Sequence, residues 1–308
     1  MDMKHKIAFV IPYYGKLPRY FPLFMESIKN QPFDILFFSD LQKPKLLPEN
    51  VLWKKISYSD LQKAFSRRLQ IEVFLMKPYK LCDFKPLYGF LFENYLSEYD
   101  FWGSIDTDTV LGNFAHFITD EILNKIDIYS GIKEYISGSF FLIRNNHDCN
   151  SLFKKSKDWI KVIKDVRYCG FDECGGHYYR QLKEGKSIFE LNTSVQSFTE
   201  IVFIEREHGL RTLFTNEIAE PKGFLPVKVD QNYIEYDGKK YLLLHFIYFK
   251  MNYYFFPKSS VLPPPYYVTA MGAFKSRPSR LRVMFSSNMI YAILKKIHIN
   301  LKKLNFRN

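Results

Sequence analysis

The sequence lacks an apolar run long enough to cross a bilayer. Its longest such run, residues 241–249, contains His245 and stops at Lys250, whereas a transmembrane helix needs roughly 20 consecutive apolar residues. The first apolar stretch, residues 7–11, is too short for the hydrophobic part of a signal peptide and runs into Pro12. We therefore expect a cytoplasmic protein without a membrane-spanning helix.

Cysteine is scarce, with four residues in a chain of 308. Four cysteines without an export signal indicate reduced thiols rather than disulfide bonds. Cys169, Cys174 and His177 could bind zinc, with Cys149 as a fourth ligand, but their spacing departs from that of the usual short zinc sites. Ordinary packed thiols are the favoured interpretation, and zinc is the alternative.

Acidic residues are absent from residues 251–308, which carry ten lysines and arginines. The whole chain has a formal net charge of +12, so the body of the protein is nearly neutral. A protein that grips nucleic acid more often spreads its basic residues over a folded face. We therefore expect no nucleic-acid partner, and RNA or DNA binding by the basic tail is the alternative.

The end of this basic segment has helical periodicity. At 100° per residue, five aliphatic residues between positions 290 and 304 share one side of a helix, and four lysines lie opposite them. Such a helix suits an anionic membrane surface. We expect peripheral attachment to the inner face of the cell membrane, and the alternative is docking of this helix against the protein's own body.

Hydrophobic residues make up 47% of the chain, which is enough for a substantial core. Short apolar runs bounded by turn residues predict buried parallel strands, and the stretches between them predict helices. The expected strands cover residues 6–12, 33–39, 51–56 and 100–105, and the expected helices cover 21–30, 60–76 and 86–98. This alternation predicts an α/β fold with right-handed crossovers.

The expected strand at 100–105 delivers two carboxylates, Asp106 and Asp108, to its carboxyl end. Ligands bind at this edge in open α/β sheets. In an extended segment residues i and i+2 face the same way, so both carboxylates can share one divalent cation. Oxygen ligands favour Mg²⁺ or Mn²⁺ over zinc. The alternative interpretation is a pair of solvated turn acids.

Four segments carry a family resemblance. They read IAFVIPYY at residues 7–14, FFSD at 37–40, KLCDFKP at 80–86 and FWGSIDTD at 101–108. Together they resemble the nucleotide-sugar half of GT-A glycosyltransferases, and more narrowly the bacterial enzymes found among capsule and O-antigen genes. The resemblance implies a mixed, mainly parallel GT-A sheet flanked by helices, with the basic helical segment as a C-terminal extension.

The resemblance also assigns the metal and acceptor residues. It implies that Asp106 and Asp108 form the family's D-x-D metal motif and that His245 is a further ligand. A packed core residue is the other interpretation of His245. Asp172 and Glu173 lie in a loop that looks able to face an acceptor, where one carboxylate would take the proton of the acceptor hydroxyl. We prefer Asp172 for this role and place Glu173 second.

The resemblance implies a second group of residues around the nucleotide sugar. The aromatic and acidic members would line the base and ribose, the lysines would offset diphosphate charge, and the glycine would let the backbone approach the sugar. This expected donor site comprises Pro12, Tyr13, Tyr14, Asp40, Asp83, Lys85, Gly138 and Lys250.

These expectations define the domains and the activity. We expect a catalytic domain over residues 1–262, with a nucleotide-binding half over about 1–115 and an acceptor half over about 116–262, and a basic tail over 263–308. The implied reaction moves a hexose from a nucleotide diphosphate sugar, with UDP favoured, to a growing surface glycan or lipid-linked acceptor, using Mn²⁺ or Mg²⁺. A metal-dependent phosphoryl-transfer enzyme or hydrolase is the alternative.

Overall fold

The computed structural model describes residues 3–223, 225–251, 255 and 262–279. The protein is a mixed α/β protein whose internal contacts divide the chain into two units, and each unit is described by itself. Unit 1 comprises residues 3–16, Lys29–Asp106 and Ala115–Asn216. Unit 2 comprises Leu17–Ile28, Thr107–Phe114 and the described residues from Glu217 onward.

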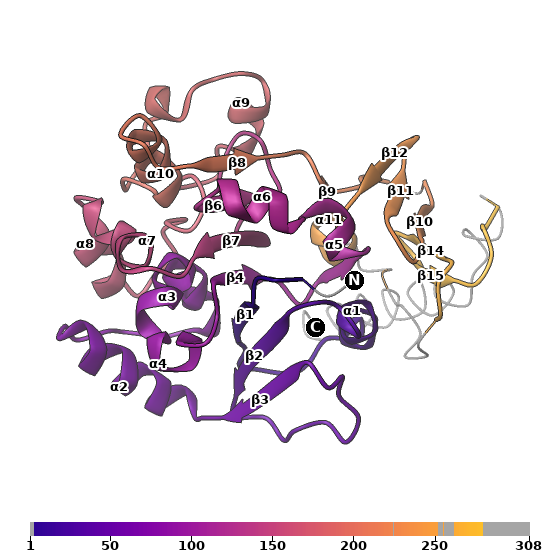
Figure 1. Cartoon of the computed structure of the whole chain (residues 1–308), viewed down its shortest axis with the longest axis horizontal. Coiled ribbons are helices and arrows are strands. Elements are labelled where there is room, and N and C mark those ends of the chain that lie inside the picture. The colour runs from indigo at the N-terminus through magenta and orange to yellow at the C-terminus, as the bar shows by residue number, and fades with distance from the viewer. Residues whose placement is uncertain (1–2, 224, 252–254, 256–261, 280–308) are drawn as a thin grey trace, which may run out of the picture. The chain divides into compact units, whose positions relative to one another are not determined.

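A seven-stranded sheet forms the centre of unit 1 (Figure 1). Its strands, in spatial order, are β3 (Val51–Lys55), β2 (Asp34–Ser39), β1 (Ile7–Pro12), β4 (Phe101–Ile105), β7 (Phe140–Arg144), β6 (Ile128–Ser130) and β8 (Thr212–Phe214). Neighbouring strands are parallel except at β7, which runs antiparallel to β4 and β6. The expected α/β class with a mainly parallel sheet is therefore confirmed.

The apolar strands of this sheet explain why its centre is buried. β1 has the sequence IAFVIP and β4 the sequence FWGSI, and almost every residue of both is inaccessible. Gly103 lets β7 approach β4 closely, because a Cβ atom there would lie 2.2 Å from the carbonyl oxygen of Phe141. Since β1, β2 and β4 run parallel, Pro12, Asp40 and Asp106 all lie at the carboxyl edge of the sheet.

Two expected helices end elsewhere than their periodicity predicts. α2 (Tyr58–Leu69) is shorter than the expected 60–76 because Gln70 adopts a left-handed conformation, with φ of 55°. The expected helix at 86–98 is replaced by a 3₁₀ helix (Pro78–Leu87) and two short helices, α3 (Tyr88–Leu91) and α4 (Glu93–Leu96). Pro86 lies inside the 3₁₀ helix rather than in a first turn, and it has no N–H to donate.

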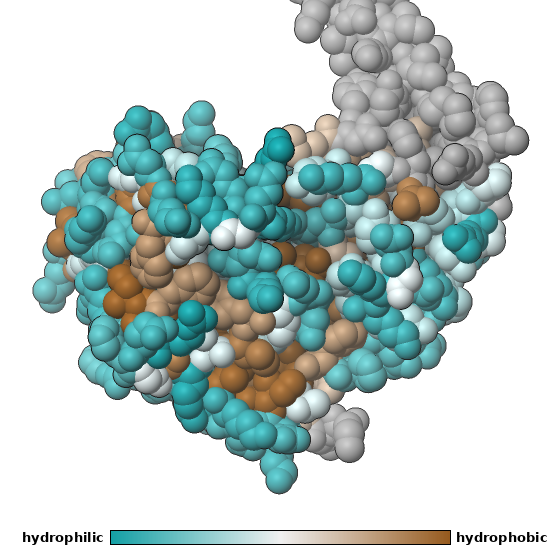
Figure 2. All heavy atoms as spheres, turned by 90° about the horizontal axis from the view of Figure 1, so that it is seen from above, coloured by the Kyte–Doolittle hydropathy of each residue, from teal (hydrophilic) through white to brown (hydrophobic). Residues whose placement is uncertain are grey.

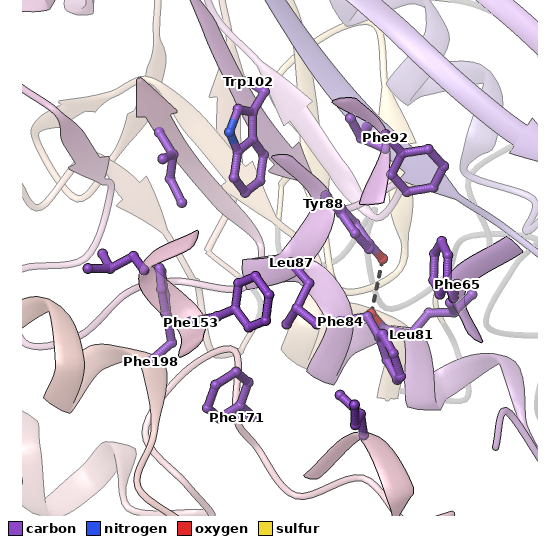
Figure 3. Close-up of a cluster of buried hydrophobic side chains, with 14 of the residues drawn as sticks. Phe65, Leu81, Phe84, Leu87, Tyr88, Phe92, Trp102, Phe153, Phe171 and Phe198 are labelled. Atoms are coloured by element: carbon purple, nitrogen blue, oxygen red, sulfur yellow. Dashed lines mark hydrogen bonds between the residues drawn. The ribbon is translucent and has the colours of Figure 1, made fainter. Parts of the chain in front are cut away.

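The helices of unit 1 pack their apolar side chains against the sheet (Figure 3). Trp102 and Tyr88 are among the largest fully buried side chains, and each polar atom has a partner. The Trp102 indole donates to Oδ1 of Asn150 at 2.6 Å, and the Tyr88 hydroxyl donates to the Leu81 carbonyl at 3.0 Å. This core therefore fixes the 3₁₀ helix that carries Asp83 and Lys85.

The remaining helices of the first 216 residues are short. They are α5 (Phe114–Phe117), α6 (Asp120–Lys125), α7 (His147–Ser151), α8 (Trp159–Lys164), α9 (Tyr179–Lys183) and α10 (Phe198–Arg206), with 3₁₀ turns at Leu152–Lys155 and Ile188–Glu190.

Unit 2 contains two small sheets and the helices α1 (Phe21–Ile28) and α11 (Ile247–Met251). One sheet has the order β5 (Thr109–Leu111), β13 (Leu243–His245), β9 (Ile218–Ala219). The other is antiparallel, with the order β12 (Lys239–Tyr241), β11 (Ile234–Tyr236), β10 (Val227–Val229), β14 (Tyr266–Thr269), β15 (Gly272–Phe274).

The expected domain limits differ from this arrangement. The expected halves are consecutive, residues 1–115 and 116–262. In the structure, each of the two units is built from several separate stretches of the chain. The tail cannot begin at residue 263, because residues 266–274 supply β14 and β15 to the antiparallel sheet. The basic amphipathic helix expected beyond residue 290 lies outside the described residues.

Hydrophilic side chains cover most of the face drawn in Figure 2, and hydrophobic ones are exposed in separate patches. Exposed aromatic residues include Tyr79 and Phe189, at 64% and 57% of their full exposure. Among the helices that the structure describes, none combines the length and the hydrophobicity needed to cross a membrane.

Candidate functional site

The D-x-D motif occupies the turn that follows β4, as expected. The Asp106 backbone N–H donates to the Ser139 carbonyl at 3.0 Å, and β5 begins directly after Asp108. Asp106 ends the Lys29–Asp106 segment of unit 1 and is bonded to Thr107, the first residue of the next segment of unit 2. The peptide chain itself therefore keeps Asp106 close to Asp108.

Strand pairing in unit 2 brings His245 beside Asp108. β13 runs antiparallel to β5 with His245 opposite Thr109, so Asp108 is the next residue along. Nε2 of His245 lies 3.4 Å from Oδ2 of Asp108, and both side chains are 7% exposed. The expected ligand pair is therefore assembled by residues that are distant in the sequence.

Two atoms of this pair have the signature of a ligand site. Oδ2 of Asp108 and Nε2 of His245 are buried and make no hydrogen bond within the described part of the chain. The ammonium of Lys250 forms an ion pair with the same Asp108 oxygen. Lys250 already offsets the charge on the Asp108 oxygen, so Nε2 of His245 is the buried atom that a bound cation would satisfy.

Charge coupling is strong in this group. Burial would raise the pKa of the Asp108 carboxyl, but His245 and Lys250 hold it well below its usual range. Burial would lower the pKa of His245, but Asp108 and Glu220 raise it to about 10. Without a metal, His245 is therefore protonated near neutral pH and faces the Asp108 carboxylate, and a metal bound by its Nε2 would displace the proton there.

Glu220 orients the His245 ring, and sequence reasoning missed this residue. β9 runs parallel to β13 with Leu244 opposite Ala219, which places Glu220 beside His245. Nδ1 of His245 lies 3.0 Å from Oε1 of Glu220. A carboxylate behind a histidine fixes the tautomer that leaves Nε2 free to bind a metal. A strand-register argument across β9 and β13 is the signal that could have identified it.

The three expected metal ligands come together. Asp106, Asp108 and His245 each offer one ligand atom, and the three atoms lie within 4.8 Å of one another. Two carboxylates with one imidazole form a donor set that can hold a divalent metal ion. The chemistry of the side chains and the two buried atoms without hydrogen bonds both fit a divalent cation.

Lys85 in unit 1 is the partner of Asp106. Its ammonium donates to Oδ1 of Asp106 and to the Gly138 carbonyl, both at 2.7 Å, and lies 4.0 Å from Oδ2 of Asp172. Burial would lower the pKa of Lys85, but the neighbouring acids, Asp106 foremost, raise it well above its usual value. Lys85 is therefore a fixed positive charge beside the metal motif.

The two candidate acceptor acids, Asp172 and Glu173, adjoin Lys85. Asp172 is buried, with 2% exposure, and burial together with the charge of Glu173 raises its pKa well above the ordinary value. Glu173 is partly exposed, and it accepts from the Gly138 N–H at 2.9 Å. Burial raises the pKa of Glu173 as well, so the two acids differ in exposure and not in the direction of this shift, and the choice of base between them stays a prediction.

Gly138 serves these acids rather than an open backbone surface. A Cβ atom at this position would lie 2.6 Å from Oδ2 of Asp172 and 3.2 Å from Oε1 of Glu173. The need for glycine at position 138 is therefore explained by the nearby acids and not by the approach of the backbone to a sugar. Only a residue without a side chain leaves room for both carboxyl groups.

Asp83 has a structural role, which corrects the expected contact with a base or ribose. Its side chain is fully buried and accepts from Lys80 Nζ and from the backbone N–H groups of Cys169 and Phe171, all at 2.8 Å. Lys80 is itself 1% exposed and also donates to two backbone carbonyls. Asp83 therefore ties the 3₁₀ helix to the loop that carries Asp172 and is closed to a nucleotide.

The other expected donor residues gather where β1 and β2 end. Pro12 closes β1, and Tyr13 donates its backbone N–H to the Phe38 carbonyl at 2.8 Å. Tyr14 is buried, and its ring packs on Tyr58 at a centroid distance of 4.8 Å. Asp40 follows β2 and is exposed. These positions place the four expected base-pocket residues at one edge of unit 1.

The alternative zinc site is not supported. Cys149, Cys169, Cys174 and His177 all lie in the described part of the chain, and no cluster of metal-ligand atoms forms among them. The thiol of Cys174 instead contacts the Gly176 carbonyl at 3.2 Å.

Comparison with known proteins identifies the family. A protein-family model described as "Family of unknown function (DUF6625)" matches residues 9–276. The chain belongs to the DUF6625 family. Among curated proteins, none matches this DUF6625 chain significantly.

Solved structures of two glycosyltransferases resemble the DUF6625 chain in part. The galactosyltransferase LgtC, solved with donor and acceptor sugar analogs, aligns over 53% of this chain and 66% of its own, with 12% identity and a TM-score of 0.32. The glycosyltransferase GlyE of Streptococcus pneumoniae TIGR4, solved in its apo form, aligns over 69% and 45%, with 12% identity and a TM-score of 0.28. The chain thus spans less than two thirds of the length of either protein.

Proposed function

We propose that this DUF6625 protein is a metal-dependent glycosyltransferase of the GT-A type. The observation that carries the proposal is the meeting of Asp108 and His245, two buried side chains whose facing atoms make no hydrogen bond. They lie beside Asp106, at the carboxyl end of a buried central strand. Substrates of open α/β enzymes bind at this edge.

The proposed ligands are Asp106, Asp108 and His245, holding Mn²⁺ or Mg²⁺. When bound, such a cation offsets the charge that develops on the donor diphosphate as the sugar leaves. Lys85 and Lys250 each place an ammonium beside one of the two aspartates. We assign these lysines to neutralising phosphate charge, in keeping with their role as point charges.

The proposed donor is a nucleotide diphosphate hexose, with UDP favoured. Pro12, Tyr13 and Tyr14 would form the base pocket, with Asp40 at its exposed side. Tyr14 is buried and its ring is tilted by 55° against that of Tyr58, and this packing holds it at the same edge as Pro12 and Tyr13. Glu173 would take the proton of the acceptor hydroxyl, and Lys85 would hold Asp172 in place.

Binding tests the metal and nucleotide assignments first. Thermal unfolding is followed with Mn²⁺, with EDTA, and with Mn²⁺ plus UDP, GDP or CMP, since a ligand that binds the folded state raises its melting temperature. Asp108→Asn should lose the Mn²⁺ shift, and His245→Ala should need more Mn²⁺. Asp230→Asn is the matched control, because Asp230 also pairs with a lysine of unit 2, Lys228, at 3.0 Å.

Measurements of turnover distinguish glycosyl transfer from hydrolysis. Nucleotide release from UDP-hexoses should require Mn²⁺ or Mg²⁺ and fall roughly 100-fold or more in Asp108→Asn, as when a transition-state charge contact is removed. Full activity in excess EDTA would refute the metal assignment. Release of nucleotide with no glycoside product, whatever glycan is offered, would instead indicate a hydrolase.

The acceptor and the membrane form a separate part of the proposal. We assign the acceptor to a growing surface glycan or a lipid-linked glycan on the inner face of the cell membrane, which the basic segment would hold near the enzyme. Deleting residues 280–308 leaves β14 and β15 intact. This deletion should abolish binding to anionic liposomes and spare donor turnover. Failure of the full chain to bind liposomes at low salt would refute membrane attachment.

A further inference from the structure

The two acids of unit 1 are each held by a tyrosine. The Tyr168 hydroxyl donates to Oδ1 of Asp172 at 2.9 Å, and the Tyr179 hydroxyl donates to Oε2 of Glu173 at 2.5 Å. These hydrogen bonds hold each carboxyl group beside a tyrosine ring. The acid pair is therefore bordered by aromatic surface.

Tyr79 extends that surface to the solvent. Its ring meets the ring of Tyr168 edge to face, with centroids 4.9 Å apart and an angle of 65°. Most of the 3₁₀ helix that carries Tyr79 is shielded from solvent. Residues 80–87 are buried except for Cys82, which is half-buried, whereas Tyr79 keeps 64% of its full exposure. The helix is thus anchored on one side and presents a rigidly supported aromatic ring on the other.

An exposed ring beside hydrogen-bonding acids matches the chemistry of a sugar. A pyranose has an apolar face of C–H groups, which packs on the electron-rich face of an aromatic ring, and a rim of hydroxyls that donate to carboxylates. Tyrosine also loses little conformational entropy when it binds, since few of its bonds rotate. Tyr79 supplies the aromatic contact, and Glu173, the partly exposed member of the acid pair, supplies the carboxylate.

We propose that Tyr79 is the stacking platform of an acceptor subsite for a neutral hexopyranose. The inference rests on the proposed glycosyltransferase function and adds to it the residue that selects the acceptor. We expect a neutral sugar because Glu173, the partly exposed acid that is proposed as the base, would repel a carboxylate or sulfate on the acceptor. Tyr168 acts as a positioning residue, since it joins the platform to Asp172.

Saturation-transfer NMR tests the subsite directly. The probes are the methyl glycosides of galactose, glucose and mannose, with the methyl glycoside of glucuronic acid as the anionic comparison. Tyr79→Ala and Tyr79→Leu should weaken binding of a neutral glycoside, and raise its KM as acceptor, by roughly two- to tenfold, the effect of one aromatic contact. Tyr79→Phe should retain most of the binding, because the ring rather than the hydroxyl makes the contact.

Phe189→Ala is the matched control, because Phe189 is also more than half exposed but lies on a different turn, Ile188–Glu190. Equal losses in Phe189→Ala and Tyr79→Ala, or no loss in Tyr79→Leu, would overturn the subsite. So would preferential binding of the glucuronide, or no glycoside binding by a wild-type protein that turns over its donor. Absence of metal-dependent donor turnover in the wild type would instead overturn the proposed function.

Discussion

Glu220 hydrogen bonds to the far side of the His245 ring, at 3.0 Å, and so directs the other ring nitrogen toward Asp108. Removing an outer partner of a metal-binding histidine typically lowers metal affinity 10–100-fold. We expect Glu220→Ala to weaken Mn²⁺ binding by roughly this factor, measured by calorimetry. Glu220→Gln should lose less, since its amide oxygen can still accept. Wild-type affinity in Glu220→Ala would contradict the proposed ligand geometry.

The buried pair Lys80 and Asp83 should dominate the stability of unit 1. Lys80→Met leaves a carboxylate buried without its partner, which we expect to cost about 3–5 kcal/mol in the free energy of unfolding. Urea titration measures this loss. Lys63→Met is the control, because Lys63 pairs with Asp60 in an exposed ion pair and should change little. Equal effects of the two variants would show that the buried pair has no special role.

Gly138→Ala tests the space between Gly138 and the acid pair. The added methyl group would lie 2.6 Å from Oδ2 of Asp172, so that carboxyl must move. Overpacking of this kind costs about 1–3 kcal/mol. We expect lower stability and a clear loss of donor turnover, with Mn²⁺ binding retained. A variant with wild-type turnover would show that the position of Asp172 does not matter to the reaction.

The ion pairs of Asp127 should make the free energy of unfolding depend on pH. Arg211 and Arg144 lie at 2.6 and 3.0 Å from its carboxyl group, and despite partial burial they hold its pKa below the ordinary value. A carboxyl whose pKa is lower in the folded state stabilises the protein above its unfolded pKa, and this stability is lost as pH falls through the folded pKa. Asp127→Asn should therefore be less stable than the wild type near neutral pH.

Urea unfolding at several pH values measures this effect. The difference between Asp127→Asn and the wild type should shrink below about pH 4 and disappear once Asp127 is protonated in both states. A difference that stays constant down to low pH would show that the loss comes from packing and not from charge.

The parallel part of the sheet could be predicted because its strands are continuous apolar runs. β1 and β4 are buried on both faces, so each is a continuous apolar run. Such a strand can be identified from its own sequence, without knowing which strand it pairs with. The sheets of unit 2 could not be predicted, because their strands have two to four residues. A run of that length shows no periodicity, and only pairing with distant strands defines it.

The position of the D-x-D motif could be predicted from local sequence, since Asp106 and Asp108 directly follow an apolar strand. The proposed role of His245 came from a family resemblance, and the pairing of β13 with β5 brings this residue beside Asp108. Asp83 was assigned wrongly because its partners include backbone groups of residues 169 and 171. A sequence does not reveal which backbone N–H groups a distant loop will present.

The strand β5 has a consequence for the order in which the protein is made. Its pairing partner, β13, follows all strands of the seven-stranded sheet in the chain, the last of which is β8 (Thr212–Phe214). Because chains leave the ribosome from the amino terminus and regions fold as they emerge, the large sheet can close while β5 still waits for β13. A ribosome-bound chain at that stage therefore has Asp106 and Asp108 in place without His245, and the proposed three-ligand site can form only late in synthesis.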